Sequence, residues 1–404
     1  MARRFTLDFL RTEAASGVLL AAAAACALAL ANSPWAGAYF RLLHAEIPLQ
    51  VGAWRASDTV AGWVRDGLMA VVFFVVGLEI KFEVLKGELS NPRRVAMPVL
   101  AALGGMVVPA ALYLLVNQGP GGDLRGWSAP VATDVGLALA VVAAVGRGLP
   151  APLRVFLMTL AIVDDLGAVA IIALAYSRHL HATPLIGAAL ALAAMAFVQR
   201  GRRVSFVYPM LGFLLAWGFA RAAGVSPSLA GVAAAFTVPA IAPRPGEPVP
   251  LKVAVEALHP WVAFLILPLF AFTSAGVAFG DIPAHDVLTP VSVGVALGLF
   301  LGKPAGVFGG AALAAVTGLA RRPGGATWAE LYGVSVLCGV GFTFSLFLGG
   351  LAFAGGDPAL LAQMKLGVIC GSLLSGLCGA VALGWAASRR RSMGAEPTPY
   401  VETT

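Results

Sequence analysis

Charged residues are scarce in this 404-residue chain. Asp, Glu, Lys and Arg together make up 12% of the sequence, while 59% of the residues are hydrophobic; soluble domains carry roughly 25% charge. Such a composition excludes a water-soluble globular domain. The Lys and Arg that are present are scattered over short segments and not gathered on one face, which argues against a nucleic-acid-binding protein. We therefore expect an integral membrane protein whose main surroundings are membrane lipid.

Cysteine is also rare, and the few cysteines follow no chemical pattern. Cys26, Cys338, Cys370 and Cys378 all lie inside apolar runs. Their spacing is that of neither a zinc site nor a disulfide framework. We interpret them as packing residues and expect no cofactor.

Long apolar runs are what the chain has in abundance. The hydrocarbon core of a bilayer is about 30 Å thick, so a crossing needs ~20 helical residues that satisfy their own backbone hydrogen bonds. We find twelve candidates, at residues 14–30, 60–80, 95–115, 127–145, 155–176, 185–198, 204–220, 229–241, 261–279, 288–316, 331–353 and 366–387.

The basic residues alternate along these runs. Cytoplasmic loops of membrane proteins collect Lys and Arg, and with the N-terminus placed inside, the inner segments hold most of them. The outer segments hold few, among them Arg41, Arg55, Arg125, Arg178 and Arg221. One missed or invented helix would scramble this asymmetry, so the pattern favours twelve crossings with both termini in the cytoplasm.

The two ends of the chain need separate interpretation. Arg3, Arg4 and the first apolar run could form a cleaved signal peptide, but Asp8 and Glu13 are unusual in such a segment and cleavage would leave eleven helices. We therefore keep the first run as a helix of one membrane domain, residues 1–387. Residues 388–404 are basic and then polar, which predicts a disordered cytoplasmic tail.

Four ionisable residues lie deep inside the apolar runs: Asp134, Asp164, Asp165 and Lys303. Each costs at least ~2.5 kcal/mol at the centre of a spanning helix, which makes them candidates for function. Asp164 and Asp165 point about 100° apart on a helix, so their roles should differ. They could simply hold the bundle together, but three acids against one Lys leave excess negative charge, which a cation or protons must relieve. This balance is typical of a cation/proton exchanger.

Two of the runs contain helix breakers. Pro130 comes shortly before Asp134, and Gly339 and Gly341 lie in the middle of the eleventh run. The ends of a broken helix carry partial charges of roughly +0.5 and −0.5. Asp134 and Lys303 are suited to neutralising a positive and a negative end, respectively. The glycines alone could equally serve close helix packing.

Seven segments follow one another along nearly the whole chain: residues 12–17, 67–81, 132–138, 161–168, 258–263, 302–304 and 339–343. Together they resemble the NhaA family of sodium/proton antiporters. The resemblance implies an all-α integral membrane fold with twelve transmembrane helices. Helices three to five would be repeated in inverted orientation as ten to twelve, and the discontinuous fourth and eleventh helices would cross at the site.

The resemblance also assigns roles to the buried charges. Asp165 is similar to the principal sodium ligand of the family, and Asp164 to the second essential carboxylate, which pairs with Lys303 when no ion is bound. Thr133 would supply a further oxygen ligand, and Asp134 would compensate the helix ends. Oxygen ligands suit a hard cation.

The expected function follows from this resemblance. The chain would be a sodium and lithium antiporter of the bacterial inner membrane and no enzyme. It would extrude sodium for external protons by alternating access and contribute to pH homeostasis. Family members exchange two protons for one sodium, so transport would be electrogenic, and many are homodimers through the stretch that corresponds to residues 41–55.

The chain departs from the family where pH regulation is concerned. Ser226 stands where many members have a His, Phe82 replaces a cation, and Val255 and Glu256 replace an acid and a His. Any pH response must then involve other groups. The candidates are Glu79, Lys81, Glu83, Asp66, Glu256 and His259, and each could equally be a solvated charge at a helix end.

Two alternatives stay open. An intramembrane aspartyl protease also needs paired buried aspartates, but such enzymes resemble a Gly-x-Gly-Asp pattern that this sequence does not contain. A degenerate relative without transport activity is the other. The intact acids and Lys303 argue against it.

Overall fold

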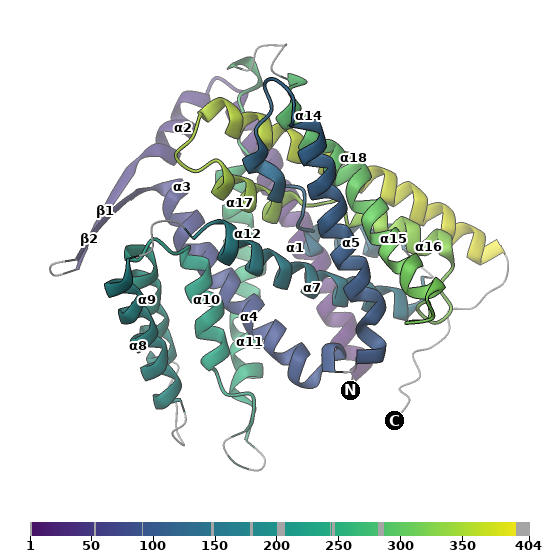
Figure 1. Ribbon diagram of the computed structural model, residues 1–404, viewed down its shortest axis with the longest axis horizontal. Coiled ribbons are helices and arrows are strands. Elements are labelled where there is room, and N and C mark those ends of the chain that lie inside the picture. Colours follow the sequence, from purple (N-terminus) through teal and green to yellow (C-terminus); the bar gives the residue numbers. More distant parts are fainter. Residues whose placement is uncertain are drawn as a thin grey trace. The chain divides into compact units, whose positions relative to one another are not determined.

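The protein is predominantly helical (Figure 1). A computed structural model describes residues 2–51, 54–90, 92–146, 149–177, 181–199, 207–242, 244, 247–281 and 287–392. Residues 393–404 of the predicted tail lie outside this range. The chain forms two compact units: the first comprises Met1–Ala22, Asn91–Ala168 and Val277–Thr404, and the second Ala23–Ser90 and Val169–Gly276. The predicted single domain of residues 1–387 stays a prediction.

The first unit contains both interrupted runs. Its elements are α5 (Pro92–Val116), η3 (Leu124–Ser128), α6 (Val135–Val145), most of α7 (Ala151–Ala175), η5 (Phe279–Asp281), α14 (Pro290–Leu297), η6 (Gly298–Gly302), α15 (Lys303–Val316), α16 (Trp328–Leu337), α17 (Phe342–Ala352) and α18 (Pro358–Ser392). Within it, α5 packs along α15, and α18 packs against α14, α16 and α17.

The second unit contains the remaining helices and a small sheet. Its elements are α2 (Ala36–His44), β1 (Glu46–Val51), β2 (Trp54–Thr59), α3 (Val60–Trp63), η1 (Val64–Leu68), α4 (Met69–Lys86), η2 (Glu88–Ser90), α8 (Ala182–Val198), α9 (Val207–Ala222), α10 (Pro227–Thr237), α11 (Pro250–Trp261), η4 (Val262–Ile266) and α12 (Leu267–Ser274). Helix α1 (Ala2–Ala31) is divided between the units. Helix α10 packs against α4 and α9.

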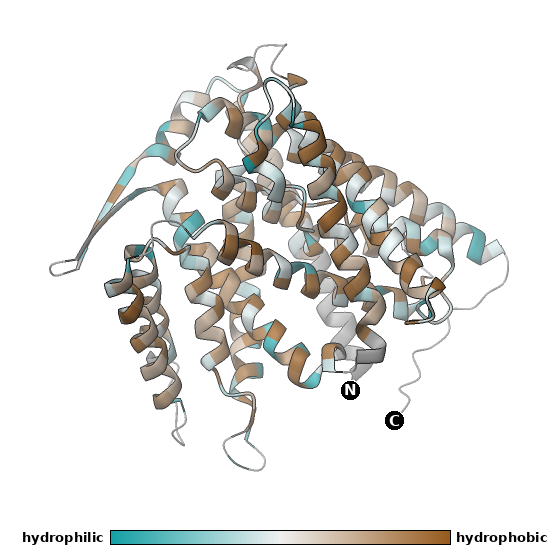
Figure 2. Cartoon of the chain, in the orientation of Figure 1, coloured by the Kyte–Doolittle hydropathy of each residue, from teal (hydrophilic) through white to brown (hydrophobic). Residues whose placement is uncertain are grey.

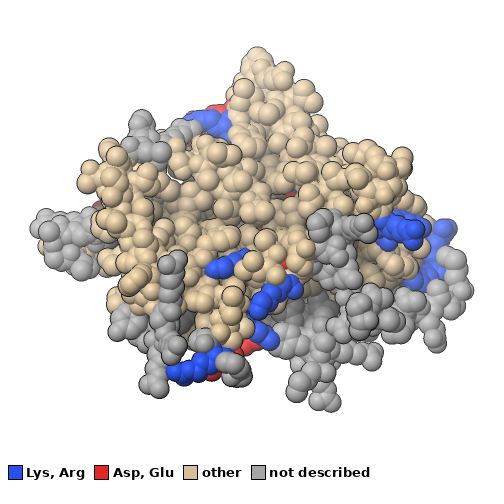
Figure 3. Space-filling model, turned by 60° about the horizontal axis from the view of Figure 1, so that its bottom comes forward, with Lys and Arg blue, Asp and Glu red and all other residues tan. Residues whose placement is uncertain are grey.

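Each of the twelve apolar runs contains helical residues. Among the described residues, five helices are long and apolar enough to cross a membrane by themselves, and two further pairs qualify if each bent pair counts as one span. One of these pairs is α16 and α17, bent by 46°. Figure 2 shows that hydrophobic residues cover most of the helical ribbon. In Figure 3 the coloured part of the surface is mostly uncharged, and its Lys and Arg side chains form small groups.

Glycine allows close packing of helices in both units. A Cβ added to Gly104 on α5 would collide with the Gly306 carbonyl on α15. In the second unit, a Cβ on Gly77 of α4 would come within 2.8 Å of the Ala235 Cβ on α10. Because lipid gives helices no hydrophobic reason to associate, such backbone approach is a main source of helix–helix attraction.

The structure contains one element that the all-helical prediction did not include, a small β-hairpin. Strands β1 and β2 form an antiparallel hairpin whose register runs from Glu46 opposite Thr59 to Val51 opposite Trp54. The segment is too polar to form a spanning run and lies between two of them, so membrane-span periodicity does not detect it.

Candidate functional site

Three polar side chains from separate elements meet inside the first unit. The Lys303 Nζ, at the start of α15, donates to Asp164 Oδ2 on α7 at 2.7 Å. The Thr133 hydroxyl donates to the same oxygen, also at 2.7 Å. The side chains of Lys303 and Asp164 are 0% and 1% exposed. Asp164 therefore contacts the Lys303 ammonium and the Thr133 hydroxyl away from bulk solvent.

An extended segment between η3 and α6 brings Thr133 to this place. Pro130 lies in this segment, where its ring and missing N–H oppose a continuous helix. The backbone carbonyl of Val131, just before Thr133, accepts a short hydrogen bond from Lys303 Nζ. One ammonium group thus binds both the Asp164 carboxylate and a carbonyl freed by the helix break.

The break between α16 and α17 lies against the same segment. Gly339 and Gly341 lie in this break, and the carbonyls beside them make no regular helical bond. The Cys338 carbonyl lies 3.0 Å from the Thr133 hydroxyl, and the Val340 carbonyl accepts the Asp134 amide at 2.6 Å. Since a hydroxyl has a single proton, Thr133 can donate to Cys338 or to Asp164 at one time.

Asp134 lies between the starts of two helices. Its Oδ1 accepts from the Leu137 amide in α6 at 3.2 Å, and its Oδ2 accepts from the Thr343 amide in α17 at 3.0 Å. The Thr343 hydroxyl donates to the same Oδ2 at 2.5 Å. The carboxylate thus occupies the place where two helix N-termini expose unpaired N–H groups and positive partial charge.

Asp164 keeps one oxygen for another partner. Among the described residues, its Oδ1 is buried and accepts no hydrogen bond. Asp165, the next residue of α7, is 9% exposed. The Lys303 ammonium and the Thr133 hydroxyl contact Asp164 and backbone carbonyls. The structure thus brings Thr133, Asp164 and Lys303 together, and places Asp165 next to Asp164 on the same helix. Carboxylate, hydroxyl and carbonyl oxygens are ligands that a hard cation prefers.

Lys303 follows an irregular helical segment. Residues Gly298–Gly302 form a π-helix, and the Lys303 amide donates to the Gly298 carbonyl, five residues earlier. Single π-turns inside α-helices occur frequently at functional sites. The Gly-Lys-Pro sequence identified Lys303 but did not predict this turn.

Some groups of the site were not assigned from the sequence. Thr343 and the carbonyls of Cys338 and Val340 received no role there, although the Gly339 and Gly341 breakers could have indicated free carbonyls at this point.

The candidate pH-regulatory residues lie in the second unit. Glu79, Lys81 and Glu83 are half-buried on α4, while Glu256 and His259 lie on α11, which packs against α4. The Lys81 Nζ donates to the carbonyls of residues 236 and 238 at 2.6 and 2.5 Å, at the C-terminal end of α10. Glu256 faces Lys252 at 3.7 Å, and both are more than half exposed. Ser226, at the N-cap of α10, is buried.

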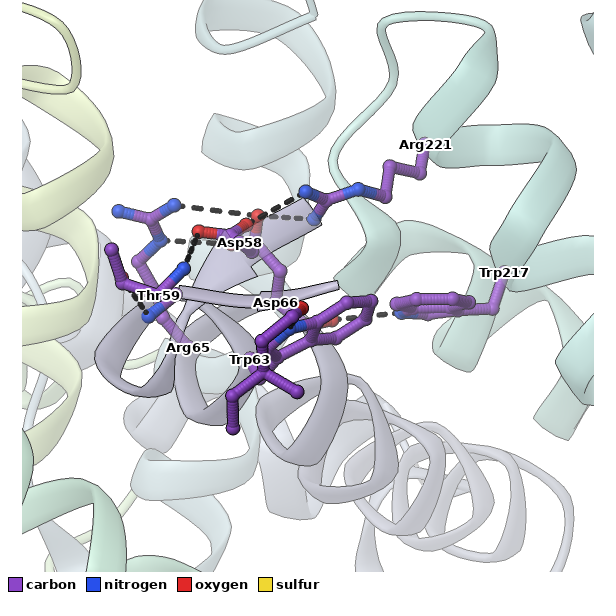
Figure 4. A network of polar contacts seen from close by, with 9 residues as sticks. Asp58, Thr59, Trp63, Arg65, Asp66, Trp217 and Arg221 are labelled. Carbon is purple, nitrogen blue, oxygen red and sulfur yellow. Dashed lines mark hydrogen bonds and ion pairs between the residues drawn. The ribbon is translucent and has the colours of Figure 1, made fainter. Parts of the chain in front are cut away.

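Asp66 belongs to a second polar network, shown in Figure 4. Arg221 on α9 donates to Asp58 at 2.7 Å and to Asp66 at 3.1 Å. Arg65 donates to Asp66 at 2.8 Å, and the Trp217 Nε1 donates to the Asp66 carbonyl at 2.8 Å. The network connects the end of β2 and η1 with α9 and balances two carboxylates with two guanidinium groups. This arrangement favours a structural role for Asp66.

Comparison with known proteins shows the family of this chain. The family model described as Na+/H+ antiporter 1 matches residues 7–383. The Na+/H+ antiporter NhaA of Rhizorhabdus wittichii is 48% identical over 380 residues, which are 94% of this chain and 97% of that protein. The proteins of the same name from Bordetella parapertussis and Pseudomonas fluorescens are 47% and 44% identical, over 92% and 95% of this chain and 94% and 97% of theirs. The chain therefore belongs to the Na+/H+ antiporter 1 family, and the relatives compared with it are named NhaA antiporters.

Proposed function

We propose that the protein exchanges sodium, and lithium, for protons across the bacterial inner membrane. The observation that carries this proposal is the Asp164 and Lys303 pair, which lies at 2.7 Å beside the hydroxyl of Thr133. Asp165 is the principal sodium ligand, Asp164 the second, and Thr133 a neutral oxygen ligand. Asp134 and Lys303 compensate the ends of the interrupted helices.

The exchange rests on competition for the carboxylates. In the proton-loaded state, Asp165 carries a proton and Asp164 pairs with the Lys303 ammonium, so the three groups have no net charge. Sodium that enters from the cytoplasm binds both carboxylates and displaces the Asp165 proton and one Lys303 proton. The sodium-loaded site then has a net charge of about −1, because two protons have left and one sodium ion has bound. The excess negative charge of buried carboxylates must be relieved either by protons or by a bound cation.

The cycle moves charge as a consequence. Rocking between inward-open and outward-open states exposes the sodium-loaded site outside, where two protons displace the ion. One net positive charge moves inward per turnover. A membrane potential of 100 mV therefore adds about 2.3 kcal/mol of driving force.

The finer architecture belongs to the same proposal. The twelve runs are twelve crossings, with helices three to five and ten to twelve related as inverted repeats. Residues 127–145 form the discontinuous fourth helix and residues 331–353 the eleventh, and these two cross at the site. The contacts of Thr133 and Asp134 with the carbonyls of Cys338 and Val340 support the crossing.

The same proposal includes the orientation of the chain in the membrane and its assembly into a dimer. Both termini face the cytoplasm, as the distribution of Lys and Arg favours. Two chains form a homodimer through the stretch at residues 41–55, which includes β1 and the start of β2, whose unpaired edges would otherwise be exposed. Membership of an antiporter family favours transport over proteolysis by the paired aspartates.

The proposed regulation involves α4 and α11. Glu79, Lys81, Glu83, Glu256 and His259 adjust the helices of the second unit as pH changes, in place of a titrating side chain at Ser226. An exchange assay between about pH 6 and about pH 9, across which His and perturbed groups titrate, tests this point.

Reconstituted proteoliposomes test the function itself. A pH gradient is imposed, and its collapse is followed after addition of sodium, lithium or potassium chloride. We expect collapse with sodium and lithium only. No response to any of the three salts over the whole pH range would contradict the proposal, and casein cleavage would then favour the protease alternative.

A further inference from the structure

A buried ion pair lies outside the site, at the far end of α16. Glu330 and Arg390 form a side-on pair: Arg390 Nε lies 2.6 Å from Glu330 Oε1, and Nη2 lies 2.8 Å from Oε2. The side chains are 1% and 10% exposed. The Arg390 Nη2 also donates to the Gly325 carbonyl. Such bidentate pairs fix geometry more strictly than single contacts.

Glu330 has a second role at the start of α16. Thr327 and Glu330 form a capping box, in which the Thr327 hydroxyl accepts the Glu330 amide at 3.2 Å and Glu330 Oε2 accepts the Thr327 amide at 2.8 Å. A capping box needs only these two reciprocal hydrogen bonds at a helix start, and no Arg. Here the acid is buried and saturated by Arg390 from the end of α18.

Helices α16 and α18 are packed in one antiparallel register. A Cβ added to Gly333 would come within 2.8 Å of the Leu383 side chain, and one added to Gly379 would collide with Leu337. A Cβ on Gly376 would touch Val340 at 3.6 Å. The Glu330 and Arg390 pair extends this series to the N-terminus of α16, so that sliding of α16 along α18 would break both of its hydrogen bonds.

The other end of α16 supplies groups to the ion site. The helix ends at Leu337, and the carbonyls of Cys338 and Val340 follow directly, in contact with Thr133 and with the Asp134 amide. A ten-residue helix is about 15 Å long and stiff. Its position at the Arg390 end therefore determines where these carbonyls lie at the site.

We propose that Arg390 and Glu330 are a positioning pair for the antiport reaction, which holds α16 in register on α18 and thereby places the carbonyls of Cys338 and Val340 at the sodium site. The inference rests on the proposed function and adds residues that never touch the ion. Positions remote from a ligand commonly change its binding by about 2- to 30-fold.

The test compares the sodium dependence of exchange in proteoliposomes of the full-length chain. The variants are Glu330→Gln, which keeps the atoms of the capping box, Arg390→Gln, and the double variant. We expect each single variant to raise the apparent KM for sodium about three- to tenfold, with a maximal rate per incorporated protein within about twofold of the wild type. The double variant should be no worse than the poorer single variant, because both remove one interaction.

Arg389→Gln is the matched control. It removes the same charge one residue earlier, from a side chain that lies over the Trp385 ring at 4.1 Å, and should leave the KM unchanged. If Arg390→Gln does not insert into vesicles, Arg390→Lys, which keeps the charge but loses the bidentate geometry, is used for the KM comparison.

A purely structural pair would lower the amount of folded protein without moving the KM. Unchanged KM values in both single variants, or fully additive changes in the double variant, would overturn the proposal, provided that the wild type exchanges sodium. Absence of exchange in the wild type contradicts the proposed function instead. Hydrogen exchange of residues 338–341 in detergent then tests the pair alone: protection equal to the wild type in Arg390→Gln overturns it, and faster exchange supports it.

Discussion

Lys303 and Asp164 are joined at 2.7 Å although 139 residues separate them in the chain, and the same ammonium binds the Val131 carbonyl at the break before α6. One side chain thus stabilises a carboxylate and a helix end together. Removing one partner of a buried pair leaves an uncompensated charge and costs about 3–5 kcal/mol.

Lys303→Gln should therefore lower the melting temperature of the purified protein in detergent. Sodium supplies the missing positive charge without having to displace a Lys303 proton, so the stabilisation by sodium should be larger in the variant than in the wild type. Thermal unfolding in sodium chloride and in potassium chloride measures both effects. An equal sodium shift in the two proteins would show that Lys303 and sodium do not compete.

Thr343→Val tests the contact of Asp134 with the start of α17. The change removes the hydroxyl that donates at 2.5 Å and keeps the backbone amide that donates at 3.0 Å. A hydrogen bond to a charged group contributes about 1.5–3 kcal/mol, so unfolding should become easier by about that amount. Asp134→Asn should cost more, because it removes the charge that compensates two helix starts. A larger loss in Thr343→Val than in Asp134→Asn would contradict this account.

The network of Figure 4 predicts a structural effect without a transport effect. Arg221→Gln removes the partner that Asp58 and Asp66 share, and Arg221 is 24% exposed. The melting temperature should fall by more than in Arg244→Gln, whose exposed pair with Glu247 is worth about 0–1 kcal/mol. The apparent sodium KM should not change. A KM shift as large as that of a site variant would assign Arg221 to the transport machinery.

Asp123 and Arg125 predict a pH effect outside the apolar runs. Hydrogen bonds from the Arg125 guanidinium hold the pKa of Asp123 below its usual value, although partial burial opposes this. A carboxyl whose pKa is lowered by folding stabilises the protein above its unfolded pKa of about 3.9, and this contribution is lost as the pH falls further. Arg125→Gln should flatten the loss of stability in this acid range, whereas Arg125→Lys should keep most of it. Identical melting curves from about pH 5 to about pH 3 for wild type and Arg125→Gln would refute the assignment.

The chemistry of the site could be predicted because charges are so costly in an apolar run. Asp134, Asp164, Asp165 and Lys303 stand out in the sequence for this reason, and Pro130, Gly339 and Gly341 indicate where helices break. The structure shows which groups these residues contact. Their roles in transport stay predictions.

Contacts between distant segments could not be predicted in the same way. No local pattern indicates that Thr133 meets the Cys338 carbonyl, which lies 205 residues away. The hairpin was missed because residues 46–59 carry no membrane-span periodicity. The capping box at Thr327 and Glu330 was not predicted, and the pairing of Glu330 with Arg390 depends on the packing of α16 on α18.

Sodium-driven proton exchange in Asp165→Asn proteoliposomes tests the central claim most directly. The variant keeps the volume of the side chain and the Asp164 and Lys303 pair but removes the charge that the account assigns to sodium binding. Asp123→Asn, in the partly exposed pair with Arg125 in the same unit, is the control and should exchange as the wild type does. The account predicts no sodium-dependent collapse of the pH gradient in Asp165→Asn at any pH from about 6 to about 9. Exchange at a rate close to that of the wild type would contradict it.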